Sequence, residues 1–369
     1  MKRILPNIFK KEEKKKTIDF SLSIEERKCM LNSHHNNPLY SLTKRDIELM
    51  DNIKKETDKN NLNNVTRTNA YLHFFDNNRE VHWALLAHIV SRNGGWNMTD
   101  LKGEAISGLL SFREKELFFS FLEKSNFLIF HDAYQQLLLY EHSKKIGKPL
   151  FHLLNKFGIS SFMRAVWEVF WKDKNSKMLT LSLIINEQHF IEKRIIQNPF
   201  YVEHVIKSIP FQLQEKLGFT NVLIPYYTGE SIQLAGTTVS QFDNITKRIH
   251  IGKHLYSLLF YVEEVQRGTL KFVKEQDHTG SRADFFSSIF TRTNDNSKKI
   301  YSPALYEAWK NSTHKLPDKD DWFQSFEKLF SYYSPISIDT PYNITEKYLL
   351  SLLKLKSIDT ITKALEIGK

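Results

Sequence analysis

The chain has 369 residues, of which 41% are hydrophobic, 13% aromatic and 25% charged. This composition is typical of a globular protein and excludes intrinsic disorder, collagen-like repeats and a small disulfide-stapled scaffold. No stretch approaches the ~18 uninterrupted apolar residues of a transmembrane helix. The apolar patch before Lys10 is too short for a signal peptide, so we predict a cytoplasmic protein without a transmembrane segment.

The formal net charge of +10 is concentrated at one end of the chain. Residues 1–16 hold seven basic and two acidic side chains, so half of the net charge lies there. Residues 1–20 are predicted to form a basic flexible tail. Such a tail can bind nucleic acid or simply keep the chain end solvated, and both interpretations remain open.

Helical patterns dominate the rest of the chain. No proline lies between Pro38 and Pro149 or between Pro225 and Pro303, and apolar residues in both gaps recur at helical spacing. We therefore predict a mainly α protein, a multi-helix globular bundle with about a dozen or more helices and little or no strand.

Local signals place several element boundaries. Helix starts are predicted at three capping-box pairs, Ser23 with Glu26, Ser111 with Glu114, and Ser281 with Asp284. Helix ends are predicted at Gly147, Gly158 and Gly218. Apolar residues from Phe242 to Val262 form the stripe of an amphipathic helix. Only Thr220–Tyr227 and Ser231–Val239 resemble strands, and an irregular connection there is equally compatible with the pattern.

The domain organisation follows from changes in composition. The predicted segments are the tail at 1–20, N-terminal helices and a linker at 21–62, the main helical body at 63–290, and a loop with C-terminal helices packed on that body at 291–369. The linker is expected at Asp58–Asn64, where the sequence reads DKNNLNN.

Several chemistries are excluded by absent residues. Cys29 is the only cysteine, which excludes an intramolecular disulfide and a multi-cysteine zinc site. It lies in the predicted helix Ile24–Asn32, where a packing role is expected. Because no Walker A, GxGxxG, EF-hand or kinase signature occurs, no cofactor is predicted.

A first polar cluster lies between residues 63 and 108. The segment Val81–Val90 is apolar on nearly all sides, which predicts a buried helix, yet it carries His82 and His88. Arg92 follows His88 one turn later on the same face. Because an isolated buried charge is unfavourable by several kcal/mol, these groups must join a hydrogen-bonded network or line a polar pocket.

The same cluster contains an expected helix end. Asn93, Gly94 and Gly95 predict a left-handed turn, after which Asn97 or Thr99 would cap another helix and leave backbone N–H groups for an anion. The preceding predicted helix places three polar residues on one face, Thr66, Asn69 and His73.

A second polar cluster is Asp277–Asp284, with the sequence DHTGSRAD. Ser281 is expected to cap a helix beside Arg282, an arrangement that favours an anion. His278, Ser281 and Asp284 are also the residue types of a nucleophilic triad, but the chain contains no GxSxG elbow, and the cap explains Ser281 and Asp284 more simply.

A metal site is not predicted. His250 and His254 stand four residues apart on a predicted helix, a spacing that can share a metal ion. The glutamate of an HExxH motif is absent and no third ligand can be named, so two surface histidines are the more common interpretation.

The chain resembles a known family. The sequences VTRTNAY and HWALLAHIVSRNGGWNMTDLKG in Val65–Gly103, together with Leu234–Phe260 and His278–Asp284, resemble the YppC-like proteins of Bacillus and its relatives. That family is classed as a domain of unknown function, so the resemblance implies a bacterial cytoplasmic protein and no catalytic residues. LLAHIVSRNGGWN is also faintly similar to the helix around the catalytic glutamate of lytic transglycosylases. The general acid of that mechanism is missing here.

The leading hypothesis is that an internal polar pocket binds a small anionic ligand. The expected ligand-binding residues are Arg67, Asn69, His88, Arg92, Asn93, Trp96 and Asn97 from the first cluster and His278, Ser281 and Arg282 from the second. In this hypothesis the arginines pair with the anion and both clusters line one cavity.

Two alternatives belong to other functional classes. The first is an enzyme in which His88 and His278 perform acid–base chemistry with Asp284 or Asp100 as the orienting carboxylate. The second is a nucleic-acid-associated protein that uses the lysine-rich tail.

Overall fold

Helices make up most of the fold, as the sequence predicts. The computed structural model describes residues 16–35, 41–104, 108, 110–208, 221–294, 298–316, 320–338 and 340–353. The helices are α1 (Ile24–His35), α2 (Lys44–Asn60), α3 (Asn64–Asn77), α4 (His82–Asp100), α5 (Phe112–Ile146), α6 (Leu154–Phe157), α7 (Ser161–Asp173), α8 (Ser176–Ile191), α9 (Pro199–Tyr201), α11 (Ile245–Tyr261), α12 (Glu263–Glu275), α13 (Leu305–Ala308) and α14 (Phe326–Phe330), with further helix at 345–353. None of the helices described is both long enough and apolar enough to cross a lipid bilayer.

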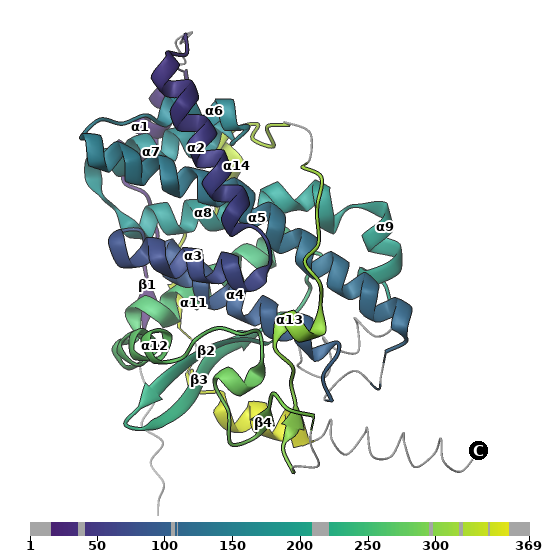
Figure 1. Ribbon diagram of the computed structural model, residues 1–369. Helices are drawn as coiled ribbons and strands as arrows, with labels where there is room; N and C mark the ends of the chain where they lie inside the picture. The colour runs from purple at the N-terminus through teal and green to yellow at the C-terminus, as the bar shows by residue number, and fades with distance from the viewer. Residues whose placement is uncertain are drawn as a thin grey trace, which may run out of the picture.

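The described strands form three two-stranded sheets, of which only the β1–β6 pair joins distant parts of the chain. The strands are β1 (Thr17–Ile18), β2 (Asn221–Thr228), β3 (Ser231–Thr238), β4 (Phe290–Thr291), β5 (Ile300–Tyr301) and β6 (Ile336–Ser337). β2 and β3 form an antiparallel hairpin, β1 pairs antiparallel with β6, and β4 pairs parallel with β5. The strand interpretation of the two ambiguous segments is therefore confirmed. Figure 1 shows α12 lying across this hairpin.

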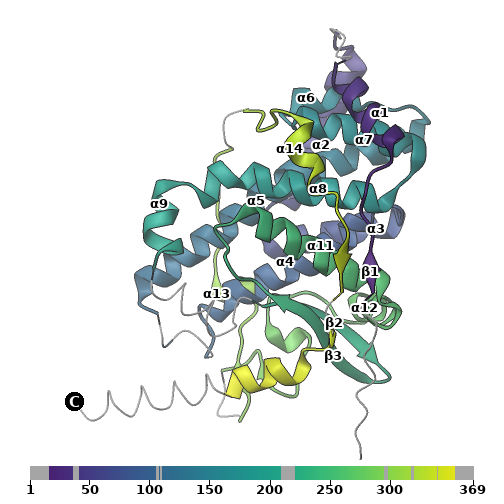
Figure 2. The same ribbon diagram turned by 180° about the vertical axis from the view of Figure 1, so that it is seen from behind.

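The pairing of β1 with β6 corrects the predicted tail. Thr17 and Ile18 lie opposite Ser337 and Ile336, and Phe20 is buried. Figure 2 shows the two strands side by side next to α11. The predicted flexible tail at 1–20 was therefore too long, because these apolar side chains pack into the core. Residues 1–15 lie outside the described part of the chain.

Most predicted helix ends are confirmed by hydrogen bonds. Reciprocal bonds of Ser23 with Glu26 and of Ser111 with Glu114 cap α1 and α5. Gly147 and Gly158 end α5 and α6 in the left-handed conformation, with φ of 69° and 81°. The predicted stop at Gly218 lies outside the described residues.

The predicted linker at Asp58–Asn64 is mostly helix. α2 continues to Asn60 and α3 begins at Asn64. Asn63 accepts the backbone N–H of Thr66 at 3.1 Å, and the Thr66 hydroxyl donates to the Asn60 carbonyl at 2.7 Å. These two bonds close a tight turn between helices, so the polar composition marks a cap and not a flexible connection.

The centre of the fold is α4, which packs against α3, α5, α8, α11 and β2. Its Trp83 and Trp96 are almost completely buried. The predicted amphipathic stripe of α11 is also confirmed, because Ile249, Tyr256 and Leu259 are buried. Cys29 is partly buried against the same core, as expected of a packing residue.

Candidate functional site

The helix end predicted at Asn93, Gly94 and Gly95 is wrong, because α4 runs unbroken to Asp100. The Asn93 amide bonds sideways to β2, accepting the Leu223 N–H at 2.8 Å and donating to the Leu223 carbonyl at 2.8 Å. These long-range bonds and the surrounding packing outweigh the weak helix propensity of the two glycines.

Asn97 and Thr99 correspondingly lie in the last turns of α4 and cap no further helix. The Thr99 hydroxyl donates to the Trp96 carbonyl at 3.0 Å and to the Gly280 carbonyl at 2.6 Å. The second of these contacts joins the first polar cluster directly to the second.

Gly95 allows a close contact between the two clusters. His278 donates its Nε2–H to Asn64 Oδ1 at 2.9 Å, and Asn64 in turn donates to the Ser91 carbonyl at 2.9 Å. A Cβ atom on Gly95 would overlap Asn64 Oδ1 and lie 2.8 Å from His278 Nε2. The glycine is therefore required for side-chain packing on the helix surface.

A buried ion pair forms the second link between the clusters. The Arg282 Nε lies 2.9 Å from both Asp100 oxygens, and its Nη2 lies 2.6 Å from Oδ2. The same guanidinium donates to Tyr348 Oη at 2.9 Å and to Asn97 Oδ1 at 3.3 Å. Burial lowers the pKa of Arg282, but the Asp100 carboxylate outweighs this effect and raises the pKa above its usual value.

The helix predicted after Ser281 is only a 3₁₀ turn, Arg282–Asp284. Ser281 accepts the Ala283 N–H at 3.1 Å, but Asp284 instead accepts the backbone N–H and the hydroxyl of Thr279, at 2.8 and 2.7 Å. The predicted capping box is therefore absent, and so short a turn lacks the aligned N–H groups that attract an anion.

Arg92 and His88 complete this packed region. Arg92 is 1% exposed, donates to the Gln276 carbonyl, and lies with its guanidinium carbon 4.8 Å from the Phe272 ring centroid. His88 donates from Nδ1 to the Thr68 carbonyl at 2.8 Å. Burial lowers the pKa of Arg92 to about 10 and also lowers the pKa of His88.

His278 is held in the same environment. Burial lowers its pKa to about 4, and the nearby positive charge of Arg92 adds to this effect although Asp284 opposes it. His88 and His278 are therefore neutral at pH 7, and both are inaccessible to solvent. This packing does not favour an acid–base role, which stays a prediction.

The structure brings most of the predicted ligand-binding residues together. We define the buried polar network as His88, Arg92, Trp96, Asp100, His278, Ser281, Arg282 and Asp284, together with the half-buried Asn97. Asn69 does not belong to it, because it is exposed on α3. Arg67 points to Glu123 at 2.5 Å instead. Two nitrogens of Arg92 have no hydrogen bond and could pair with an anion, but both are buried from solvent. Anion binding by these residues therefore stays a prediction.

A cleft lies between α4, α5, α8, α11 and the β2–β3 hairpin. Its two lobes have volumes of about 180 and 250 Å³. The residues shared by both lobes include Val90, Asn126, Ile129, Gln188, Val222 and Phe242. The walls are mainly apolar, and the shared residues show that the two lobes adjoin.

Polar side chains interrupt the apolar walls of the cleft at several places. Asn93, Asn97 and Asp100 face the larger lobe, whereas Arg67 and Arg248 face the smaller one. All of these except Arg248 belong to the predicted first cluster, so that cluster contributes to an open cavity.

Both arginines of the cleft have partners. Arg67 pairs with Glu123, and Arg248 pairs with Glu192 and donates to Gln188 Oε1 at 2.8 Å. Because each arginine already faces a carboxylate, the described residues of the cleft offer no uncompensated positive charge for an anion.

Glu187 is a further residue of the smaller lobe that sequence reasoning missed. Burial raises its pKa to about 8, and the neighbouring Asp132 adds to this effect. The only sequence signal is an acidic residue near the end of the apolar run LSLIINEQHF, which is also the pattern of an ordinary helix end.

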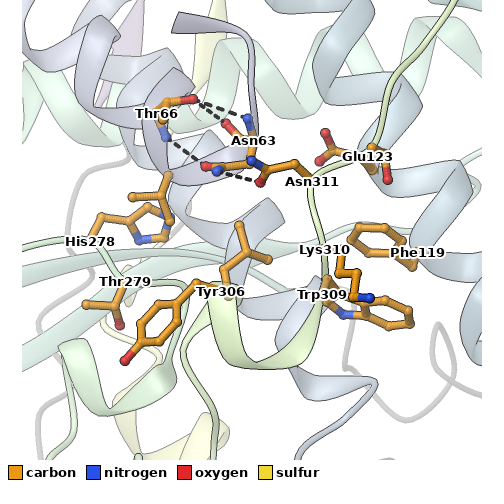
Figure 3. Close-up of a pocket in the computed structure, with 13 residues that line it drawn as sticks. Asn63, Thr66, Phe119, Glu123, His278, Thr279, Tyr306, Trp309, Lys310 and Asn311 are labelled. Carbon is orange, nitrogen blue, oxygen red and sulfur yellow. Dashed lines mark hydrogen bonds between the residues drawn. The ribbon is translucent and has the colours of Figure 1, made fainter.

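A separate pocket of about 240 Å³ lies beside α3, α5 and α13. Figure 3 shows Asn63 and Thr66 on one side of it, His278 and Thr279 on a second, and Glu123 on a third. Burial raises the pKa of Glu123, although Arg67 opposes this effect. Sequence reasoning missed Glu123 as well, because a single carboxylate within a long helix carries no motif.

The two candidate metal ligands, His250 and His254, differ in their exposure to solvent. His250 is exposed, whereas His254 is buried. In the described ranges of the chain, no three or more His, Cys, Asp or Glu side chains are grouped so that they can hold a metal ion.

The fold and site define a mainly α protein with a buried polar network and an apolar cleft along one central helix. The chain belongs to the family described as "Protein of unknown function (DUF2515)", which matches residues 59–351. It is 38% identical over 320 residues to the uncharacterized protein YppC of Bacillus subtilis (strain 168), covering 86% of this chain and 97% of that protein. The predicted resemblance is thus confirmed. No solved structure matches the chain.

Proposed function

We propose that this protein binds a small molecule with a mainly apolar body in the cleft along α4. The observation that carries the proposal is that two mainly apolar lobes adjoin along α4 and share part of their walls. Ligand sites are usually concave, mostly apolar and supplied with a few polar groups that fix orientation. This cleft has those properties.

The exposed apolar surface of Val90 favours the binding of an apolar ligand in the cleft. It lines both lobes and is 39% exposed, although most of α4 around it is buried. Covering apolar surface of this kind is favourable by about 25 cal/mol per Å² removed from water. A ligand with an apolar body therefore obtains binding energy directly from this wall.

The charges at the cleft favour a neutral ligand over the anion expected from the sequence. Arg67 and Arg248 each pair with a glutamate, and Asp100 pairs with Arg282. An anion would have to compete with these carboxylates for the same guanidinium groups. A neutral ligand leaves all three ion pairs intact.

The test is a fluorescence titration with Nile red, a neutral aromatic dye. We expect saturable binding to the wild-type chain and a loss of affinity of about tenfold or more in Val90→Trp, because the indole fills the space between the lobes. The matched control is Ile47→Trp, since Ile47 is a similarly exposed apolar residue on α2.

The control variant should bind Nile red as the wild type does, and thermal unfolding should show that both variants are folded. If the wild type does not bind Nile red saturably, or if both tryptophan variants bind equally well, the cleft is not the binding site.

A further inference from the structure

Glu187 is distinguished from the other charged residues that line the cleft. Arg67, Arg248 and Asp100 each have an oppositely charged partner within an ion pair. For Glu187 no lysine, arginine or histidine nitrogen lies within 4 Å among the described residues. Among the described residues of the cleft, Glu187 is thus the acidic side chain without an oppositely charged partner.

The groups around Glu187 come from several elements. On its own helix, Gln188 donates to Glu187 Oε1 at 3.2 Å. The titratable or charged groups that face it are Asp132 on α5, Tyr71 and Arg67 on α3, and Arg248 on α11, with the Trp83 indole on α4. Both arginines are engaged by other carboxylates, so neither one neutralises Glu187.

This environment determines the protonation state of the carboxyl group. Burial raises the pKa of Glu187 to about 8, Asp132 raises it further, and hydrogen bonds from Gln188 and Trp83 oppose the shift. At pH 7 the group is therefore mostly protonated. A neutral carboxylic acid carries one O–H donor, which an ionised carboxylate lacks.

We propose that Glu187 is the polar anchor of the cleft and donates a hydrogen bond from its carboxyl O–H to an acceptor oxygen of the bound molecule. The ligand class is then a neutral molecule with an apolar body and a ketone, amide or ether oxygen. This inference rests on the proposed function, because it names the group that orients a ligand in the same cleft.

The proposal makes binding depend on pH with a defined sign. Below pH 8 the O–H group is present and the ligand oxygen is bound. As the pH rises through about 8, the group becomes a carboxylate whose lone pairs repel the same oxygen, so affinity falls. Asp132 also titrates, with a pKa of about 7, and must be separated from Glu187 by a variant.

The experiment measures Nile red affinity at pH 6.5 and pH 9.5, because this dye carries a carbonyl oxygen. We expect the wild type to lose about tenfold in affinity between the two values. Glu187→Gln keeps an N–H donor that does not titrate, so its affinity should be the same at both pH values. Glu187→Leu should bind weakly at both. Asp132→Asn should keep the wild-type pH dependence.

Carbon-13 NMR of the glutamate carboxyl groups provides a second readout that needs no ligand. The signal missing from Glu187→Gln identifies the residue, and its midpoint in the wild type should lie near pH 8. A midpoint near the usual glutamate value overturns the inference, and so does an unchanged pH dependence in Glu187→Gln.

These failures differ from failure of the proposed function. If the dye binds the cleft but the pH dependence persists in Glu187→Gln or disappears in Asp132→Asn, only the anchor is wrong. If the wild type does not bind the dye saturably at either pH, both the cleft assignment and the anchor are overturned.

Discussion

The buried polar network and the apolar cleft lie along the same helix but differ in how their side chains are packed and partnered. In the network, Arg282 and Asp100 are buried and joined by hydrogen bonds as short as 2.6 Å. In the cleft, Val90 leaves apolar surface exposed, and no cation of the described part of the chain lies within 4 Å of Glu187. The network contains the residue types that suggest chemistry, yet they are packed in the interior and bond to one another or to neighbouring groups such as the Thr68 and Gln276 carbonyls. The cleft contains few such residues and leaves space for a ligand.

The comparison shows why polar motifs are an uncertain guide to function. A polar side chain that must be buried requires partners, and once it has them it stabilises the packing of the elements that supply them. Arg282 holds the segment after α12 onto Asp100 of α4 in this way, and His278 holds it onto Asn64 of α3. The cleft instead holds Glu187, a carboxyl group that accepts hydrogen bonds but has no cation within 4 Å among the described residues.

Breaking the ion pair of the network should have the largest effect. Asp100→Asn leaves the buried Arg282 charge without its carboxylate, and we expect unfolding free energy to fall by about 3–5 kcal/mol. Urea denaturation followed by circular dichroism measures this change. The control is Glu263→Gln at the exposed pair with Arg267, where a change below about 1 kcal/mol is expected. Equal losses in the two variants would contradict the assignment of the network as structural.

The two adjacent glycines of α4 offer a sharper comparison of the regions. Gly95→Ala forces a Cβ against Asn64 and His278, so we expect a loss of about 1–3 kcal/mol in urea denaturation. Gly94→Ala meets the Asn126 side chain at 3.1 Å, beside the cleft, where that side chain can shift. Its better helix propensity should offset the contact and leave stability within about 1 kcal/mol of wild type. A larger loss of stability in Gly94→Ala than in Gly95→Ala would show that the network is not tightly packed.

The carboxyl groups near the cleft and in the network should titrate in different pH ranges. The resulting changes in unfolding free energy should be smaller than those of the variants above. Burial raises the pKa of Asp132 to about 7 and of Glu187 to about 8. Burial also raises the pKa of Asp284, but the adjacent His278 and the Thr279 hydrogen bonds outweigh it and lower that pKa.

A carboxyl whose pKa is raised by folding contributes stability that is fully present below its unfolded pKa, near 4, and is lost as the pH rises through the folded value. Asp132 and Glu187 should therefore lower stability between pH 4 and pH 8, whereas Asp284 contributes in the opposite sense at lower pH. Asp132→Asn should reduce the fall between pH 5 and pH 7.5 by about 1–2 kcal/mol, measured by urea denaturation at each pH. A fall as steep as in the wild type would mean that Asp132 does not titrate in this range.

Local signals predicted the elements that depend on neighbouring residues. Ser111 with Glu114 and Gly147 bound α5 as expected, because a cap is formed by backbone and side-chain groups within one turn. The same kind of signal failed at Asn93 and Ser281. There, bonds to Leu223 and Ser302, far away in the sequence, outweigh the local preference.

The candidate site was predicted only in part. Asn93 and Asn97 do line the cleft, and His278 lines the separate pocket beside α13. Glu187 and Glu123 were missed, because a carboxylate in an apolar helix has no local signature of its environment. Their pKa shifts arise from the elements packed around them, which only the folded chain specifies.

By itself, the sequence determined that the chain is mainly helical, that α4 is buried, and that its charged residues need partners. These properties follow from composition, apolar periodicity and the free energy of burying charge, all of which depend on residue type and short spacing. Only the tertiary structure decided that Arg282 meets Asp100 and that Glu187 faces the cleft with none of the described cations within 4 Å. The partners of these groups come from other elements, and no local pattern encodes which distant side chain will arrive.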